Sequence, residues 1–225
     1  MSAPGLRHGL LDACGVEHGF GERSSLAPPD VLRPTQVHGR SVARVGRDGT
    51  LAPEEADAVI SSLPGRAVAV VTADCVPVLA ASRDGRWVAA IHAGWKGLAL
   101  GVIPAALSAL RGAHPTASWV AVVGPHIGRA HYEVDRPVLD PLRAAFGDDL
   151  DAALAPTGPG HALLDLGRLA QTALDRAGLA PEARGAIERP CTFSQPERFH
   201  SHRRDGAAAG RLLHHIAPRS ALDRS

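Results

Sequence analysis

Short runs of apolar and β-branched residues, separated by turn-forming residues, make up much of the chain. Such continuous runs are typical of strands that are buried on both faces. The turn residues Arg83, Asp84 and Gly85 stand between two of these runs and predict a β-hairpin. The runs predict strands at Ser41–Val45, Asp57–Ser61, Ala67–Thr72, Val76–Ser82, Arg86–His92, Trp119–Gly124 and Arg211–Ile216.

Helical periodicity is clearest after Asp165, a residue type that commonly caps a helix N-terminus. Residues 166–177 place leucines and alanines on one face, and Gly178 follows in the position where helices often end. A second helix is predicted at Leu98–Leu110, with a kink or a delayed start caused by Pro104, and a weaker one at Pro137–Phe146. The proline-rich segment Ser24–Gln36 predicts an extended loop.

These elements predict a mixed sheet with helices packed against it, in the α+β (mixed α/β) class. The chain of 225 residues with 45% hydrophobic content is sufficient for one core, so we expect a single domain, a layered sandwich over residues 1–225. The formal net charge of +1 gives no reason to expect nucleic acid or an anionic membrane as the main partner. The odd cysteine count of 3 and the absence of a secretory pattern at the start predict a reduced, cytoplasmic protein.

Three short segments combine metal-ligand residue types with small, turn-forming neighbours: Thr35–Gly39, Thr72–Pro77 and Ile91–Gly97. Cys75 and His92 are joined by the predicted hairpin, and His38 would reach them from a loop. A Cys/His/His set suits Zn²⁺, and three protein ligands leave a fourth position open, as catalytic zinc sites do. The residues alone equally allow separate structural roles for a buried cysteine and two hydrogen-bonded histidines.

The motifs QVHG, ADAVIS, TADCVPVL, AAIHAGWKG, VVGPHIG, LLDLGRLAQTAL and CTFSQPERFHSHRRDGAAAGR occur in this order between about Gln36 and Arg211. In this arrangement the chain resembles the YfiH-like family, whose members are variously described as laccase-domain proteins, purine nucleoside phosphorylases and peptidoglycan editing factors. The resemblance implies an α/β sandwich in which zinc is bound by the residues that match His38, Cys75 and His92. It also implies phosphorolysis of adenosine, inosine and methylthioadenosine, with some deamination of adenosine. The part before Gln36 is shorter than in typical members of the family.

Further candidates surround the three expected ligands. Asp74 could orient a metal-bound histidine or transfer a proton, so the expected catalytic set is Asp74, Cys75 and His92; a turn role for Asp74 is the alternative. Lys96, Arg203 and Arg204 are candidates for a phosphate site, since arginine and lysine supply fixed positive donors. Of the two adjacent arginines we expect one to face phosphate and the other to pair with Asp205 or a backbone carbonyl. The resemblance adds Arg23 as a further substrate-binding residue.

The leading prediction is therefore a zinc-dependent purine nucleoside phosphorylase whose ligands are purine nucleosides and phosphate, acting as a monomer or a small homo-oligomer. A metal-free hydrolase with Cys75 as nucleophile and His92 as base is a second possibility. A third is a non-catalytic role in peptidoglycan editing. A copper oxidase is disfavoured, because blue-copper sites usually add an axial methionine and Met1 is the chain's single methionine.

Overall fold

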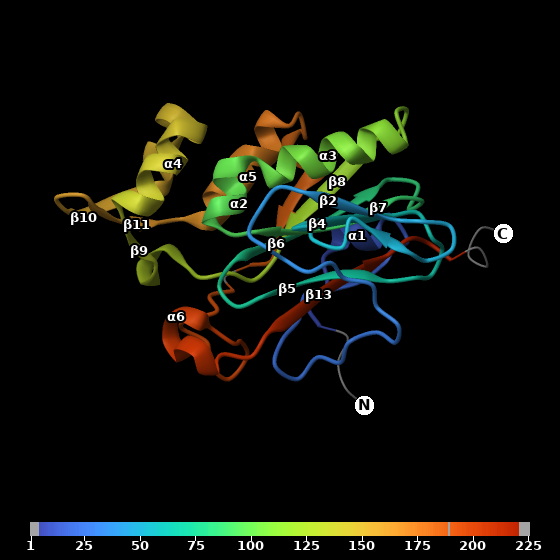
Figure 1. Ribbon diagram of the computed structural model, residues 1–225, viewed down its shortest axis with the longest axis horizontal. Coiled ribbons are helices and arrows are strands. Elements are labelled where there is room, and N and C mark those ends of the chain that lie inside the picture. Colours follow the sequence, from blue (N-terminus) through green and yellow to red (C-terminus); the bar gives the residue numbers. More distant parts are fainter. Residues whose placement is uncertain (1–4, 189, 221–225) are drawn as a thin grey trace.

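The computed structural model describes residues 5–188 and 190–220. Its main sheet has seven strands in the order β12-β8-β6-β7-β4-β2-β3 (Figure 1). The strands pair in parallel at β12–β8 and β2–β4 and antiparallel elsewhere, so the predicted mixed sheet is confirmed. The bounds are β2 Val42–Val45, β3 Leu51–Ala52, β4 Ala58–Ser61, β6 Val76–Ser82, β7 Val88–Ala93, β8 Trp119–Val123 and β12 Arg184–Ala186.

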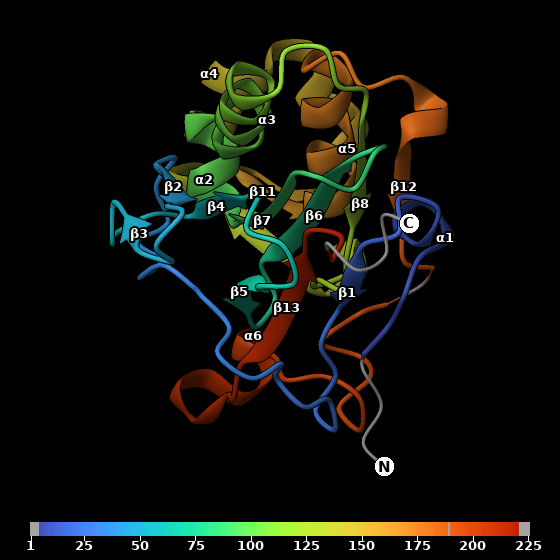
Figure 2. The ribbon, with the colours of Figure 1, turned by 90° about the vertical axis from the view of Figure 1, so that its right-hand side faces the viewer.

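A different layer covers each face of this sheet (Figures 1 and 2). Helices α2 (Trp95–Leu100), α3 (Val102–Ala113) and α5 (Leu166–Arg176) pack on one face. A three-stranded sheet in the order β1-β13-β5 packs on the other, through strands at Glu17–Gly19, Leu212–Ala217 and Val68–Thr72. The molecule is thus a sandwich with a helical layer, a central sheet and a small second sheet.

The central strands are apolar throughout because each face of the sheet has its own core. In β6, Val78 and Ala80 pack with the helices, whereas Leu79 and Ala81 pack against the small sheet. Successive side chains of a strand point to opposite faces, so a strand buried on both sides needs apolar residues at consecutive positions. This explains the runs from which the strands were predicted.

The predicted capping of α5 is confirmed. The Asp165 side chain accepts a hydrogen bond from the backbone N–H of Arg168 at 2.8 Å, and Gly178 follows the helix with a φ of 80°.

The helix predicted at Leu98–Leu110 is in fact two helices, α2 and α3. The break lies at Gly101, whose φ of 83° ends α2, and Pro104 lies within the first turn of α3, where its missing N–H is tolerated. The prediction was therefore wrong about the cause of the interruption: glycine, rather than proline, makes it.

The remaining elements lie around this sandwich. An antiparallel three-stranded sheet in the order β10-β11-β9 carries α4 at one end of the molecule, and α6 lies below it near the small sheet (Figure 1). No helix among residues 5–188 and 190–220 is long and apolar enough to cross a membrane. The bounds are α1 Gly9–Asp12, β9 Glu133–Asp135, α4 Arg136–Phe146, β10 Leu154–Gly158, β11 His161–Leu164 and α6 His202–Asp205, with short 3₁₀ helices at Arg129–His131, Gly147–Ala153, Pro181–Ala183 and Gly206–Ala208.

Candidate metal centre

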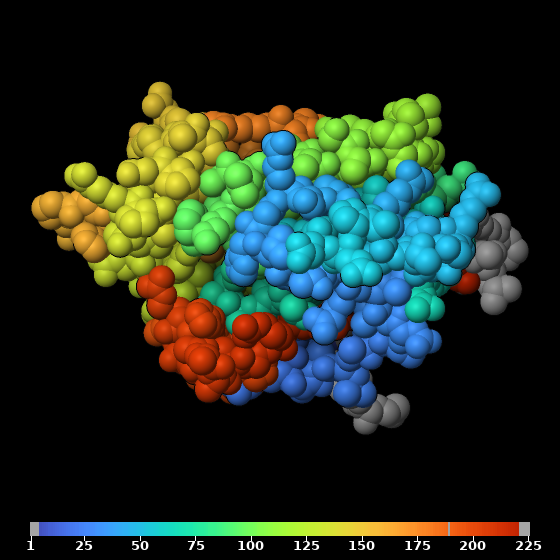
Figure 3. Space-filling model, viewed as in Figure 1, coloured from blue at the N-terminus to red at the C-terminus, as the bar shows by residue number. Residues whose placement is uncertain are grey.

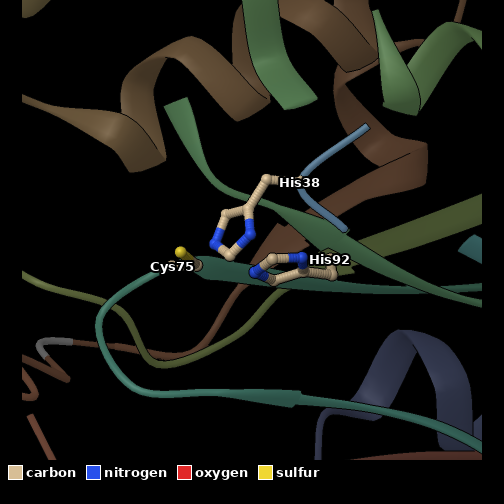
Figure 4. Close-up of side chains that lie close together, drawn as sticks. All are labelled: His38, Cys75 and His92. Carbon is tan, nitrogen blue, oxygen red and sulfur yellow. The ribbon is translucent and has the colours of Figure 1, made fainter. Parts of the chain in front are cut away.

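The side chains of His38, Cys75 and His92 meet where the inner strands β6 and β7 of the central sheet begin and end (Figure 4). Their candidate ligand atoms all lie within 4.8 Å of one another, and the two imidazole rings meet edge-to-face at a centroid distance of 4.8 Å. Cys75 directly precedes β6, and His92 lies on the neighbouring strand β7, where it is paired with Pro77. The antiparallel hairpin therefore brings the thiol and one imidazole together, and the loop before β2 adds the other.

The carboxylate of Asp57 holds both histidines. It is fully buried at the start of β4, and its Oδ1 lies 2.8 Å from His92 Nδ1. The same carboxylate accepts hydrogen bonds from the backbone N–H groups of His38 at 2.9 Å and Gly39 at 2.6 Å. With Nδ1 of His92 held in this way, Nε2 is the nitrogen that remains available to a metal ion.

The His38 loop needs these anchors because its backbone is in an unfavourable conformation. His38 has a φ of 59°, a region that residues other than glycine seldom occupy. Upstream, the Gln36 side chain pairs with the backbone of Val71 in β5, donating to its oxygen at 2.8 Å and accepting from its nitrogen at 2.7 Å. The loop is thus hydrogen-bonded to the small sheet through Gln36 and to the segment that enters the central sheet through Asp57.

The three side chains also influence one another's ionisation. Burial raises the pKa of the Cys75 thiol, but hydrogen bonds with His38 and His92 outweigh burial and bring that pKa down to about 7. Burial lowers the pKa of His92, but hydrogen bonds with Asp57 and Cys75 outweigh this effect and raise it to about 9. A thiolate is therefore accessible near neutral pH, which both a metal ligand and a nucleophile require.

Gly94, which begins helix α2, allows this close approach. A Cβ atom placed on Gly94 would lie 3.0 Å from Cys75 Sγ and 3.3 Å from His38 Cδ2. Any residue larger than glycine at position 94 would thus crowd two of the three candidate ligands, Cys75 and His38.

A cavity of about 590 Å³ opens beside the three side chains. It lies between the loop before β2, the β5–β6 connection and the C-terminal segment around α6, which forms a prominent red lobe in Figure 3. Besides His38, Cys75 and His92, its lining includes Gln36, Thr72 and three basic residues, Arg33, His202 and Arg211. The candidate ligands are therefore accessible to a small molecule.

Asp74 lies next to Cys75 in sequence, but its carboxylate is bonded elsewhere. Its Oδ1 accepts a hydrogen bond from the Thr192 hydroxyl, and its Oδ2 accepts one from the backbone N–H of Arg203, both at 2.6 Å. Asp74 is buried, with a φ of 89°. The histidine-orienting role expected of Asp74 is thus performed by Asp57, and Asp74 connects the turn before β6 to helix α6.

The residues expected to bind substrate or phosphate lie outside the lining of this cavity. Lys96 is exposed, with its ammonium 5.5 Å from the centroid of the Trp95 ring. Arg23 donates to the Pro196 carbonyl at 2.7 Å. Their assignment to a phosphate site is not supported by this placement, since neither side chain faces the His38, Cys75 and His92 group from the cavity.

Arg203 and Arg204 also take different positions from those expected of an anion site. Arg204 bonds Asp205 and the carbonyls of Thr192, Phe193 and Phe199, which confirms that one of the two arginines pairs with Asp205 and backbone oxygens. Arg203 donates to the Glu133 carbonyl at 3.0 Å, and its guanidinium lies over the Tyr132 ring in a separate cleft. The two residues are neighbours in the short helix α6, so their side chains leave the chain in different directions.

Sequence reasoning missed Asp57, Arg33 and Arg211. The sequence identifies Asp57 only as the beginning of a strand, because its contacts with Gly39 and His92 lie 18 and 35 positions away in the chain. Arg33 stands in a loop without a motif of its own, and Arg211 ends the motif that begins at Cys191 without being singled out there. Their convergence on one cavity depends on contacts between segments that lie far apart in the chain.

Comparisons with known proteins agree with this architecture. Residues 19–219 match the family model described as multi-copper polyphenol oxidoreductase laccase. A relative from Pseudomonas aeruginosa, named purine nucleoside phosphorylase, is 38% identical over 169 residues, which are 75% of this chain and 66% of that protein, just under two thirds of its length. The Escherichia coli relative named purine nucleoside phosphorylase YfiH is 37% identical over 80% of this chain and 71% of its own.

Solved structures show the same fold. The crystal structure of YfiH from Bacillus licheniformis is similar with a TM-score of 0.77 and 28% identity, over 84% of this chain and 74% of that one. A Neisseria meningitidis protein has a TM-score of 0.75 and 34% identity, over 84% and 75% of the two chains. The chain belongs to the YfiH-like family, the family of the laccase-type model that covers most of its length.

Proposed function

We propose that this protein is a zinc-dependent purine nucleoside phosphorylase that acts on adenosine, inosine and methylthioadenosine. The observation that carries the proposal is the group of His38, Cys75 and His92 beside a cavity large enough for a nucleoside, in a family with members named for this activity.

Zinc fits the donor set better than copper does. One thiolate and two imidazoles are ligands that Zn²⁺ favours, and they leave a coordination position open. Copper sites of the blue type usually add an axial methionine, and the chain's single methionine, Met1, lies outside the described residues. Within residues 5–188 and 190–220, one group of three candidate ligands is found, whereas a multicopper enzyme needs several metal sites. When bound, Zn²⁺ would supply Lewis acidity inside the cavity.

The proposed reaction exchanges one bond at the ribose for another. An oxygen of HPO₄²⁻ bonds to C1′ of the nucleoside as the bond from C1′ to the purine nitrogen breaks. The electron pair of that bond leaves with the purine, which takes the proton of the phosphate, so ribose 1-phosphate and the free base are formed. The protein's part is to bind both reactants in one cavity, which removes the entropic cost of their encounter.

The proposal includes a secondary deamination of adenosine, in which water replaces the amino group and inosine and ammonia are formed. This component is carried over from the family resemblance. It predicts a second product whose appearance does not depend on phosphate.

A metal-free cysteine hydrolase is the second candidate. The hydrogen-bonded series Cys75, His92 and Asp57 has the order of nucleophile, base and orienting carboxylate, and the pKa of Cys75 is lowered to about 7. A cysteine that is bound to zinc is a poor nucleophile, so metal content separates the two candidates.

The test is product analysis of the metal-loaded protein with adenosine, with and without phosphate. The proposal predicts adenine and ribose 1-phosphate only when phosphate is present, and loss of both products in Cys75→Ala. Adenine release that ignores phosphate would show hydrolysis instead. Absence of any conversion would favour the non-catalytic role in peptidoglycan editing.

A further inference from the structure

Apart from the candidate metal centre, the ionisable residues that line the cavity are all basic. Arg33 comes from the loop before β2, His202 begins α6, and Arg211 directly precedes β13, so three separate segments contribute them. No aspartate or glutamate of the described chain belongs to the cavity lining. The nearby carboxylate of Asp57 is fully buried and is engaged with His92 and the His38 loop. The cavity therefore has the charge that a small anion requires.

Arg33 and Arg211 have guanidinium N–H donors that are not used within the described chain, unlike the neighbouring Arg204. The guanidinium of Arg33 makes no hydrogen bond or ion pair with residues 5–188 and 190–220. Arg211 uses one nitrogen, Nη1, for the carbonyls of Ala209 at 2.9 Å and Gly210 at 3.1 Å. These bonds fix the direction of its guanidinium and leave Nε and Nη2 without a partner in the described part of the chain. Arg204, by contrast, is bonded through three nitrogens to carbonyls and to Asp205.

We propose that Arg33 and Arg211, assisted by His202, bind the inorganic phosphate co-substrate within the cavity, beside His38, Cys75 and His92. The planar guanidinium matches the oxygens of phosphate through paired N–H donors, which makes arginine the residue best suited to this anion. The assignment rests on the proposed function, and it replaces Lys96, Arg203 and Arg204 as the phosphate site.

The test compares Arg33→Ala, Arg211→Ala and the double variant with the wild-type protein, all loaded with zinc. Arg47→Ala is the matched control. Arg47 is an exposed arginine between β2 and β3, and it does not line the cavity. Two quantities are measured: the phosphate KM at saturating adenosine, and the affinity for inorganic phosphate by isothermal titration. Each single variant should raise the phosphate KM by about tenfold and weaken binding by a similar factor, which is the ordinary effect of losing one charge-assisted contact. Zinc content and the adenosine KM should remain those of the control.

The two readouts keep this assignment separate from the proposed function. If the wild-type protein converts no nucleoside, the proposed function fails, and the titration alone still decides whether the two arginines bind phosphate. Phosphate affinity and KM that are unchanged in the double variant would overturn the assignment. It would also be wrong if Lys96→Ala or Arg203→Ala produced the tenfold effect instead. A further titration with adenosine 5′-monophosphate separates the two sources of a phosphate group. Weaker binding of this nucleotide in the double variant, with phosphate affinity and KM unchanged, would show that the cluster binds a nucleotide's phosphate rather than the co-substrate.

Discussion

Asp57 connects the two histidines of the candidate metal centre. Its carboxylate accepts from the N–H groups of the His38 loop and lies 2.8 Å from His92 Nδ1, so one buried side chain sets the position of one ligand and the orientation of another. Partners of this kind usually change metal affinity by about 10- to 100-fold when they are replaced, because the ligand loses its fixed direction.

We therefore expect Asp57→Asn to weaken zinc binding by about 10- to 100-fold. The amide keeps the size of the carboxylate but turns a donating NH₂ group towards N–H groups that need an acceptor. Competition with a chromogenic chelator measures the affinity, and Asp48→Asn, at an exposed turn position, serves as the control. Equal zinc affinity in the two variants would mean that Asp57 supports only the fold.

The three candidate ligands could be predicted from the sequence, whereas their partner could not. His38, Cys75 and His92 stand in the QVHG, TADCVPVL and AAIHAGWKG motifs that resemble the YfiH-like family, whereas their residue types alone also allow separate structural roles. Asp57 was hidden because aspartate commonly begins a strand or a turn, and its role depends on contacts with residues 18 and 35 positions away. The basic residues Arg33 and Arg211 were missed for the same reason: arginine is common on surfaces, and only the folded chain shows which ones share a cavity.

Helix α6 is connected to the metal centre through a buried network. Asp74 receives hydrogen bonds from Thr192 and from the backbone of Arg203, and it directly precedes Cys75. The turn that presents the thiol is thus joined to the segment that closes the cavity on the C-terminal side. Because Thr192 is fully buried, its hydroxyl has no access to solvent as an alternative partner.

Replacing the hydroxyl in Thr192→Val should reduce the free energy of unfolding by about 1–3 kcal/mol, the usual cost of leaving a buried polar group without its partner. Urea denaturation measures this change. In the matched variant Thr172→Val, the lost bond is an exposed one within α5, and the expected change is within about 0.5 kcal/mol. If both variants lose the same stability, the Asp74 network contributes nothing particular to the fold.

The seven strands predicted from apolar runs lie within two residues of their observed bounds, whereas the single helix predicted at Leu98–Leu110 is two helices. The apolar runs were long and continuous because both faces of the central sheet are covered, and this requirement is visible in the sequence itself. The division between α2 and α3 is not visible in the sequence. Gly101 has a left-handed backbone in the fold, but a glycine within a helical pattern does not by itself predict that conformation. The placement of Ala67–Thr72 in a second sheet with the C-terminal strand likewise depends on contacts between distant segments.

The whole molecule is a sandwich whose two sheets are both hydrogen-bonded to the loop that carries His38. The His38 loop is fastened to β5 of the small sheet by Gln36 and to β4 of the central sheet by Asp57. A metal ion that binds the folded chain but not the unfolded chain raises the free energy of unfolding by mass action. Zinc bound at this centre should therefore stabilise both sheets together.

The most direct test of the proposed zinc centre is the metal content of the purified protein, measured by elemental analysis without exposure to chelators. We predict one zinc ion per chain in the wild-type protein, none in Cys75→Ala, and full occupancy in Cys191→Ala, since Cys191 is a half-buried cysteine outside the cavity lining. Full retention of zinc in Cys75→Ala, or copper in place of zinc in the wild-type protein, would contradict the account.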